Sequence, residues 1–161
     1  MQAEARLAER PFEPGDELAS FLAELKEEGG VVSFVGVARP RSPGGDVVER
    51  LFLDHHPRLT KLSLENIASD AARRFDVTSV RVVHRCGVVL PGEPIVFAAT
   101  AGLHRRAAFE AADYLMDRLK TDAVFWKREE GVDGAVWIEP TEADRQGRAR
   151  WNEICPESTK R

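Results

Sequence analysis

The stretch VTSVRVVHRCGVVLPGEPIVFAATAG, residues 77–102, decides the fold that the sequence predicts. It contains two runs rich in β-branched residues, and such runs are typical of strands. The runs meet at LPGE, where Pro91 and Gly92 suit the two central positions of a type II turn. Strands joined by a tight turn pair antiparallel, so the stretch predicts a hairpin in the middle of the chain.

Helical patterns surround this hairpin. Apolar residues at helical spacing predict helices over residues 15–30, 56–75 and 104–120, and a short helix is expected from residue 142 onward. The predicted apolar faces consist of Leu18, Phe21, Leu22 and Leu25 in the first helix, of Leu59, Leu62, Ile67, Ala71 and Phe75 in the second, and of Ala108, Ala111, Ala112, Leu115 and Leu119 in the third.

Further strand patterns lie between these helices. Residues 31–38 form a short apolar run that predicts a buried strand, and the proline- and glycine-rich loop after it, residues 39–45, is expected to be mobile. Residues 49–55 predict another strand. Residues 123–129 and 135–140 predict a strand pair that turns through GVDG.

Hairpin signals recur along the chain, which favours an α+β fold with a mainly antiparallel or mixed sheet over a doubly wound parallel one. The length of 161 residues fits a single domain. We expect a folded core over about residues 1–152 and a flexible charged tail over residues 153–161.

Composition excludes several classes of protein. The formal net charge of −4 argues against broad binding to nucleic acid or to a membrane surface, so any cationic site must be local. No apolar run approaches the roughly 20 residues that span a bilayer, and the N-terminus does not resemble a signal peptide. Cys86 and Cys155 lie far apart, which suggests neither a disulfide framework nor a paired metal motif. A cytoplasmic protein is expected.

Basic residues crowd the predicted start of the third helix, at His104, Arg105 and Arg106. A helix N-terminus carries a partial positive charge, so cations there are mildly unfavourable. Two interpretations are open. In the first, the side chains are simply solvated or paired with carboxylates; in the second, they form an anion site together with the free N–H groups of the helix.

Two lysines flank the next apolar run. Lys120 ends the third helix, where a cation interacts favourably with the helix dipole. Lys127 continues the strand face that begins with Ala123 and Phe125, so it is expected at the edge of an apolar pocket, where a lysine can have a lowered pKa. Snorkelling of Lys127 to solvent is the alternative. Arg39 ends a strand, from which it can reach a cleft.

No signature of a nucleotide or metal enzyme is present. The sequence contains no P-loop, no dinucleotide glycine fingerprint and no Gly-x-Ser-x-Gly elbow. His55, His56 and His84 lack partners at the spacing that zinc requires, so we expect structural histidines and neither a metal nor a cofactor.

Three runs in fixed order carry a family resemblance: SFVGVAR at residues 33–39, HRCGVVLPGE at 84–93, and HRRAAFEAADYLMDRLKTDAVFWKRE at 104–129. Together they resemble the large, catalytic subunit of molybdopterin synthase, and the similarity extends over most of the chain to RARW at 148–151. Chains of that family have an α/β hammerhead fold and insert two sulfur atoms into cyclic pyranopterin monophosphate. The sulfur arrives as a C-terminal thiocarboxylate on a small ubiquitin-like carrier subunit.

The resemblance also implies roles for particular residues. The catalytic lysines of the family fall on Lys120 and Lys127, and its contacts to the substrate phosphate fall on Arg39, His104 and Arg105. It further implies a homodimer within a heterotetramer, in which the His-Arg pair reaches the active site across the dimer interface. The internal Gly-Gly pairs show that this chain is not the carrier.

The chain departs from the family at a few positions. Val124 stands where the family usually has proline, and DHHP, GLHR and PRSPGG replace the commoner sequences at residues 54–57, 102–105 and 40–45. Two other kinds of protein would explain the cations: a non-catalytic module that binds a phosphorylated small molecule, and a scaffold that docks an acidic partner.

Overall fold

The computed structural model describes residues 1–153 and contains two four-stranded sheets. The first sheet consists, in spatial order, of β1 (Gln2–Ala8), β4 (Ser79–Arg85), β6 (Pro94–Gly102) and β2 (Gly30–Val37). In it β1 runs parallel to β4, and the other pairs are antiparallel. The second sheet is antiparallel throughout and consists, in spatial order, of β5 (Gly87–Val89), β3 (Arg50–His55), β7 (Phe125–Gly131) and β8 (Gly134–Ile138). The predicted α+β class with mainly antiparallel pairing is therefore confirmed.

The predicted central hairpin is confirmed. β4 (Ser79–Arg85) pairs antiparallel with β6 (Pro94–Gly102). In the turn between them the Glu93 N–H donates to the Leu90 carbonyl at 3.0 Å, and Gly92 has a φ of 88°, as position i+2 of a type II turn requires. One feature was not predicted: β5 (Gly87–Val89) leaves the first sheet between these strands and pairs with the second.

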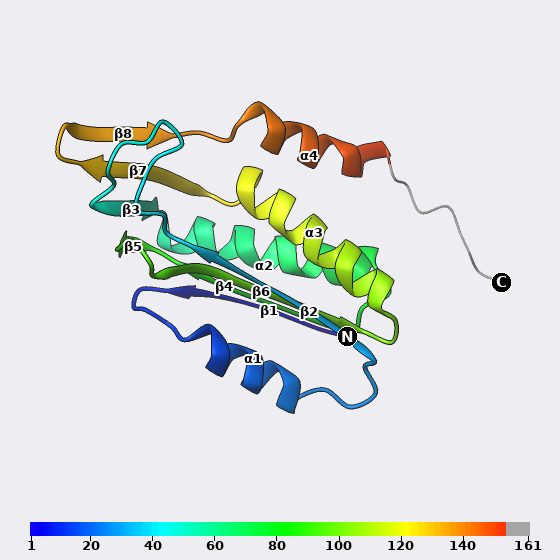
Figure 1. The fold of residues 1–161 in the computed structure, drawn as a ribbon. Coiled ribbons are helices and arrows are strands. Elements are labelled where there is room, and N and C mark those ends of the chain that lie inside the picture. Colours follow the sequence, from blue (N-terminus) through cyan, green and yellow to red (C-terminus); the bar gives the residue numbers. More distant parts are fainter. Residues whose placement is uncertain (154–161) are drawn as a thin grey trace.

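Helices cover both faces of the first sheet (Figure 1). α1 (Pro14–Ala23) lies on one face, and α2 (Pro57–Arg74) and α3 (Arg105–Thr121) lie side by side on the other. α4 (Glu142–Glu153) packs along the outer side of α3. The main core forms where α2 and α3 meet the sheet.

Two predicted helix faces need correction. α1 ends at Ala23 rather than at the glycines, because the Glu28 carboxylate accepts the N–H groups of Lys26 and Glu27 and turns the chain there. Its Leu22 is exposed, whereas Phe21 is buried. In α2, Leu59 and Leu62 are also exposed, and the buried side is formed by Thr60, Leu64, Ile67, Ala68, Ala71 and Ala72. All five predicted core residues of α3 are buried.

Two strands differ from the prediction. β1 was not recognised, because Glu4 and Arg6 interrupt its apolar residues, yet Ala5 and Leu7 pack on the main core. β2 (Gly30–Val37) was expected to be buried, and this is wrong: it is an edge strand, and Phe34 is 43 % exposed. A strand with a single neighbour keeps an open side whatever its composition.

The second sheet lies at one end of the α2–α3 layer (Figure 1). β3 (Arg50–His55) is its centre together with β7 (Phe125–Gly131), and β8 (Gly134–Ile138) forms the predicted hairpin with β7. The loop after β2 is held by backbone hydrogen bonds, among them Ser42 N–H to Asp46 O at 2.9 Å. The sheets thus meet around the C-terminal end of α3.

Two further findings bear on the expectations from sequence. No helix within residues 1–153 is long and apolar enough to cross a bilayer. The tail expected over residues 153–161 lies, from residue 154 onward, outside the described residues.

Candidate functional site

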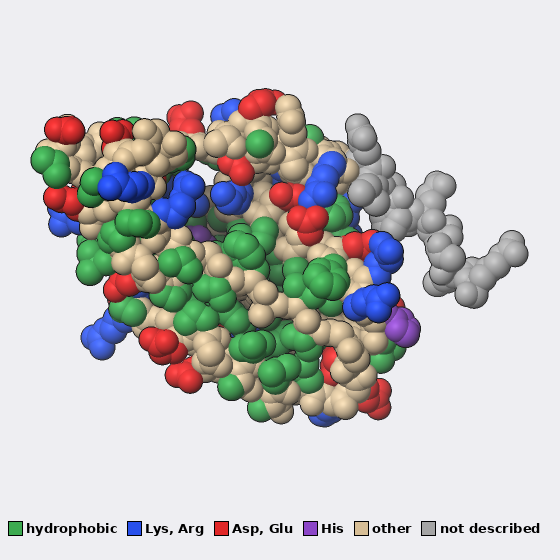
Figure 2. All heavy atoms as spheres, viewed as in Figure 1, with side chains coloured by type: hydrophobic (Ala, Val, Ile, Leu, Met, Phe, Trp, Pro, Cys, Tyr) green, Lys and Arg blue, Asp and Glu red, His purple; other side chains and the backbone are tan. Residues whose placement is uncertain are grey.

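A cavity of about 410 Å³ opens between the two sheets, beside the C-terminal end of α3. Its walls are largely apolar and include Leu51, Leu53, Ile95 and Leu119. Figure 2 shows Lys and Arg side chains gathered around this hollow, with apolar side chains below them. The cavity is therefore an apolar chamber with a cationic rim.

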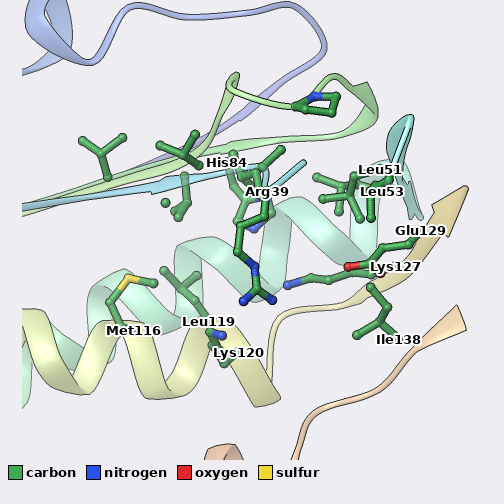
Figure 3. Close-up of a pocket in the computed structure, with 18 of the residues that line it drawn as sticks. Arg39, Leu51, Leu53, His84, Met116, Leu119, Lys120, Lys127, Glu129 and Ile138 are labelled. Carbon is green, nitrogen blue, oxygen red and sulfur yellow. The ribbon is translucent and has the colours of Figure 1, made fainter. Parts of the chain in front are cut away.

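Three of the five predicted site residues meet here. Arg39 follows β2, Lys120 is the penultimate residue of α3, and Lys127 lies in β7. Figure 3 shows their nitrogen atoms converging from three directions on the same space. Lys120 is close enough to Lys127 for its charge to lower the Lys127 pKa. Like charges repel, so three cations around one cavity favour the binding of an anionic ligand.

Strand alternation places Lys127 as predicted. Phe125, Lys127 and Glu129 share the cavity side of β7, whereas Trp126 points away and is 54 % exposed. Burial lowers the pKa of Lys127; the charge of Lys120 lowers it further, and Asp144 opposes both effects. A larger fraction of Lys127 is therefore a free amine at neutral pH than an exposed lysine would show.

Lys120 has a different environment. Its side chain is 57 % exposed, and its Nζ lies 3.8 Å from the Asp144 Oδ1 in α4. The helix dipole also favours a cation at this position. Lys120 is thus a charged group at the rim, and Lys127 is a partly desolvated group inside.

His84 forms part of the cavity wall, a role that the sequence did not indicate. It is buried, stacks on Phe125 with ring centroids 4.2 Å apart, and its Nδ1 lies 2.7 Å from the Arg85 carbonyl oxygen. A carbonyl only accepts, so Nδ1 carries the hydrogen. Burial, and next the charge of Lys127, lower the pKa of His84 to about 3, so the ring is neutral at physiological pH. The expectation of a structural histidine is correct for His56, whose Nδ1 caps α2 by accepting the Leu59 N–H.

Val124 fixes the entry of the chain into β7. Its N–H donates to Ser63 Oγ at 3.1 Å, and its carbonyl accepts from Thr60 Oγ1 at 2.6 Å. A proline at this position would lack the N–H. The departure at Val124 therefore adds a hydrogen bond to α2 and leaves Lys127 in the cavity.

The remaining two predicted residues lie elsewhere. His104 is the N-cap of α3 and makes no side-chain capping bond, and Arg105 is the first residue of the helix. Both line a second, shallow hollow together with Arg106 and Phe109. The 17 residues of α3 span about 25 Å, so this pair does not reach the lysines within one chain.

Two acidic residues of the site were missed as well. Glu129 lines the cavity, and its spacing of two from Lys127 was the available signal. Asp144 approaches the rim from α4, and no sequence pattern links α4 to the end of α3. Within the described residues, no three His, Cys, Asp or Glu side chains are grouped as metal ligands.

Comparison with solved structures places this chain among the proteins of molybdopterin biosynthesis. The solved structure of the molybdopterin biosynthesis MoaE protein from Burkholderia ambifaria superposes with a TM-score of 0.77 at 36 % identity, covering 96 % of this chain and 100 % of that one. The family model described as MoaE protein matches residues 7–122.

Curated relatives agree with this placement. The molybdopterin synthase catalytic subunit of Caulobacter vibrioides is 47 % identical over 147 residues, which is 91 % of this chain and 96 % of the relative. The Escherichia coli protein of the same name is 43 % identical over 88 % of this chain and 93 % of its own length. The chain belongs to the MoaE protein family.

Proposed function

We propose that this protein is the catalytic subunit of molybdopterin synthase. It transfers sulfur from the C-terminal thiocarboxylate of a small ubiquitin-like carrier subunit to cyclic pyranopterin monophosphate and so forms the dithiolene of molybdopterin. One observation carries the proposal: Arg39, Lys120 and Lys127 converge on a single apolar cavity. The full-length relatives with the name of this enzyme support it.

The cavity suits both reactants. Its volume of about 410 Å³ lies within the range of small-molecule sites, roughly 300–1,000 Å³. The substrate phosphate and the carboxylate-derived carrier tail are both anionic, and fixed cations in an apolar surrounding bind anions more strongly than cations in water. Arg39 offers a planar fork of donors that matches a phosphate.

The two lysines divide the work according to their environments. Lys120, exposed at the rim, is placed to meet the arriving tail and to stabilise developing negative charge or bond transiently to substrate. Lys127, with its lowered pKa, is the better group for proton transfer inside the cavity. His84 supplies a neutral wall beside it, which adds no further positive charge.

His104 and Arg105 complete the site from a second copy of the chain. They are exposed, carry no acidic partner in the first turn of α3, and lie at the far end of the helix from Lys120. In this proposal a homodimer places the pair of one protomer against the lysines of its partner, and two carrier subunits complete a heterotetramer. The cytoplasm, where thiols stay reduced, is the proposed location.

Turnover with purified thiocarboxylated carrier tests the proposal. The wild-type chain should convert cyclic pyranopterin monophosphate to a dithiolene product when carrier is supplied, and should be inactive with carrier that ends in a plain carboxylate. Binding of the pyranopterin without conversion would instead establish a non-catalytic binding module. Capture of carrier without pyranopterin binding would establish a docking scaffold.

A further inference from the structure

Asp144 in the first turn of α4 uses its two carboxylate oxygens for different purposes. Oδ2 accepts the N–H and the hydroxyl of Thr141, both at 2.8 Å, and the Asp144 N–H returns a bond to Thr141 Oγ1 at 3.2 Å. This reciprocal pair caps the start of the helix. Oδ1 faces Lys120 Nζ at 3.8 Å. The cap therefore fixes the carboxylate in a direction that brings its second oxygen to the pocket rim.

The rest of α4 holds this arrangement in place. Trp151 is buried in the main core, and its indole N–H donates to Asp117 Oδ2 at 2.6 Å. Arg150 pairs with Asp113 and Asp117, and Arg148 pairs with Asp122. Figure 1 shows α4 running beside α3. Asp144 is thus attached to a docked helix rather than to a free loop.

Gly147 allows the close approach of these two helices. A Cβ atom at this position would lie 2.8 Å from Asp117 Oδ1, a distance too short for a carbon atom. A side chain at position 147 would therefore push α4 outward or displace the Asp117 side chain. Gly147 thus leaves room for the Asp117 carboxylate, to which Trp151 and Arg150 of α4 bind.

The charges around Lys127 come from several elements. Arg39, Lys120 and the neutral His84 face it from the β2 end, α3 and β4, and Glu129 shares its strand. Asp144 is the carboxylate that α4 adds to this group. Its negative charge raises the pKa of Lys127, in opposition to burial and to Lys120. Asp144 therefore interacts with both lysines, although it lies on a different element from either.

We propose that Asp144 is a positioning residue for the two pocket lysines, which holds Lys120 at the rim as its counter-ion until an anionic reactant replaces it. The inference rests on the proposed function in that the replacing anion is the substrate phosphate or the carrier tail. An ion pair with one exposed partner contributes little, so the exchange costs little. Asp144 partly offsets the lowering of the Lys127 pKa in the empty pocket and is displaced from Lys120 when the pocket fills.

The test compares Asp144→Asn with Glu142→Gln. Both remove one negative charge from the same turn of α4, but Glu142 is paired with Arg145 and is 73 % exposed. Asparagine still accepts hydrogen bonds from Thr141, so the cap survives. NMR titration of isotopically dimethylated lysines reports proton binding at Lys127, with the signal assigned by Lys127→Arg. Calorimetry with inorganic phosphate reports anion affinity.

Asp144→Asn should weaken proton binding at Lys127 and tighten phosphate binding, each about two- to fivefold, as expected for the loss of one screened charge interaction. Glu142→Gln should change neither proton binding at Lys127 nor phosphate affinity. Asp144→Glu, which keeps the negative charge, should give wild-type values of both. Unchanged values in Asp144→Asn, or equal changes in Glu142→Gln, would overturn the proposal.

Two further measurements keep the result interpretable. Near-UV circular dichroism of the core Trp151 shows whether α4 remains docked, and Asp144→Ser, which keeps a capping oxygen without the charge, replaces Asp144→Asn if docking is lost. Neither the NMR nor the phosphate measurement uses sulfur transfer. A wild-type chain without turnover would therefore refute the proposed function and leave the assignment of Asp144 to be decided on its own data.

Discussion

The two ends of helix α3 carry the same kind of side chain in opposite electrostatic settings. At its C-terminal end Lys120 is favoured by the helix dipole and faces Asp144. At its N-terminal end Arg105 opposes the dipole and forms no ion pair within the described residues. Lys120 thus has a counter-ion within its own chain, and Arg105 has none within the described residues. Cations that a chain does not itself compensate indicate a ligand or a second protomer.

The largest expected effect is the loss of turnover when a lysine near the C-terminal end of α3 is removed. Lys120→Ala and Lys127→Ala should each reduce turnover by a factor of roughly 10² to 10⁴, the range of a lost proton-transfer or charge-stabilising group. Lys61→Ala is the matched control, since Lys61 is a helical lysine of similar exposure that pairs with Glu65 and lies outside the cavity lining. Near-normal turnover in either pocket variant would remove that lysine from the catalytic role.

Subunit mixing tests whether the two ends work in different protomers. Mixed Lys120→Ala and Arg105→Ala chains should form heterodimers in which one pocket carries both defects and the other carries none, so that up to half of the activity per heterodimer returns. Lys120→Ala mixed with Lys127→Ala should recover nothing, because both residues belong to one cavity. Native mass spectrometry confirms exchange. Proven exchange without recovery would place the whole site within a single chain.

Measurements of pyranopterin affinity test the two ends of α3 separately. Arg39→Ala and Arg105→Ala should each weaken binding about ten- to a hundredfold, since each removes a charge-assisted contact of roughly 1.5–3 kcal/mol. Arg106→Ala is the control for Arg105, because Arg106 is 85 % exposed and pairs with Glu110. Calorimetry measures the difference. Equal affinity in Arg105→Ala and wild type would leave the N-terminal end without a role in binding.

Burial of His84 in the cavity wall makes the stability of the folded chain depend on pH. The pKa of His84 is about 3 in the folded chain and about 6.5 in the unfolded one, so the unfolded chain takes up the proton first. The stability from neutral His84 is complete above pH 6.5 and falls by about 1.4 kcal/mol for each pH unit below it. Urea unfolding from pH 7 to pH 5 should show a loss of about 2 kcal/mol. The loss should be absent from His84→Gln; an equal loss in that variant would assign it to other groups.

The smallest expected effect is on the free energy of unfolding, where the two ends of α3 can be compared directly. Arg105→Ala should raise the free energy of unfolding by about 0.3–1 kcal/mol, because it removes a cation from a helix N-terminus, and Lys120→Ala should lower it by a similar amount. Thermal unfolding at low salt measures both, and the difference should shrink in high salt. A lower stability in Arg105→Ala would show that Arg105 has a compensating contact.

The parts of the fold that could be predicted are those encoded locally. Helix α3, the hairpin turn at Pro91-Gly92 and the cavity side of Lys127 follow from periodicity and turn chemistry. β1 depends on parallel pairing with a strand far away in the sequence, and its own pattern is weak. The exposure of β2 depends on its place at the sheet edge, which no residue of the strand determines.

The residues of the site also divide into those that the sequence indicates and those that only the tertiary structure reveals. Lys127 could be proposed from its own strand because it continues a face that begins apolar, whereas Lys120 is ordinary at a helix end and was named through the family resemblance. His84, Glu129 and Asp144 could not be proposed, since a histidine in a strand and an acid in a helix are ordinary until the tertiary structure brings them to the rim. The family resemblance named Arg39, His104 and Arg105, and the separation of the last two from the cavity became visible only in three dimensions.

The walls of the cavity come from segments spread along most of the chain, from Arg39 after β2 to Lys127 in β7. During synthesis the first sheet can form once β6 has emerged, but the chamber has no β7 wall until later residues leave the ribosome. A nascent or truncated chain that ends before β7 thus holds Arg39 without Lys127 and has no enclosed space for a substrate. Binding of any ligand in this cavity therefore waits until β7 has been synthesised.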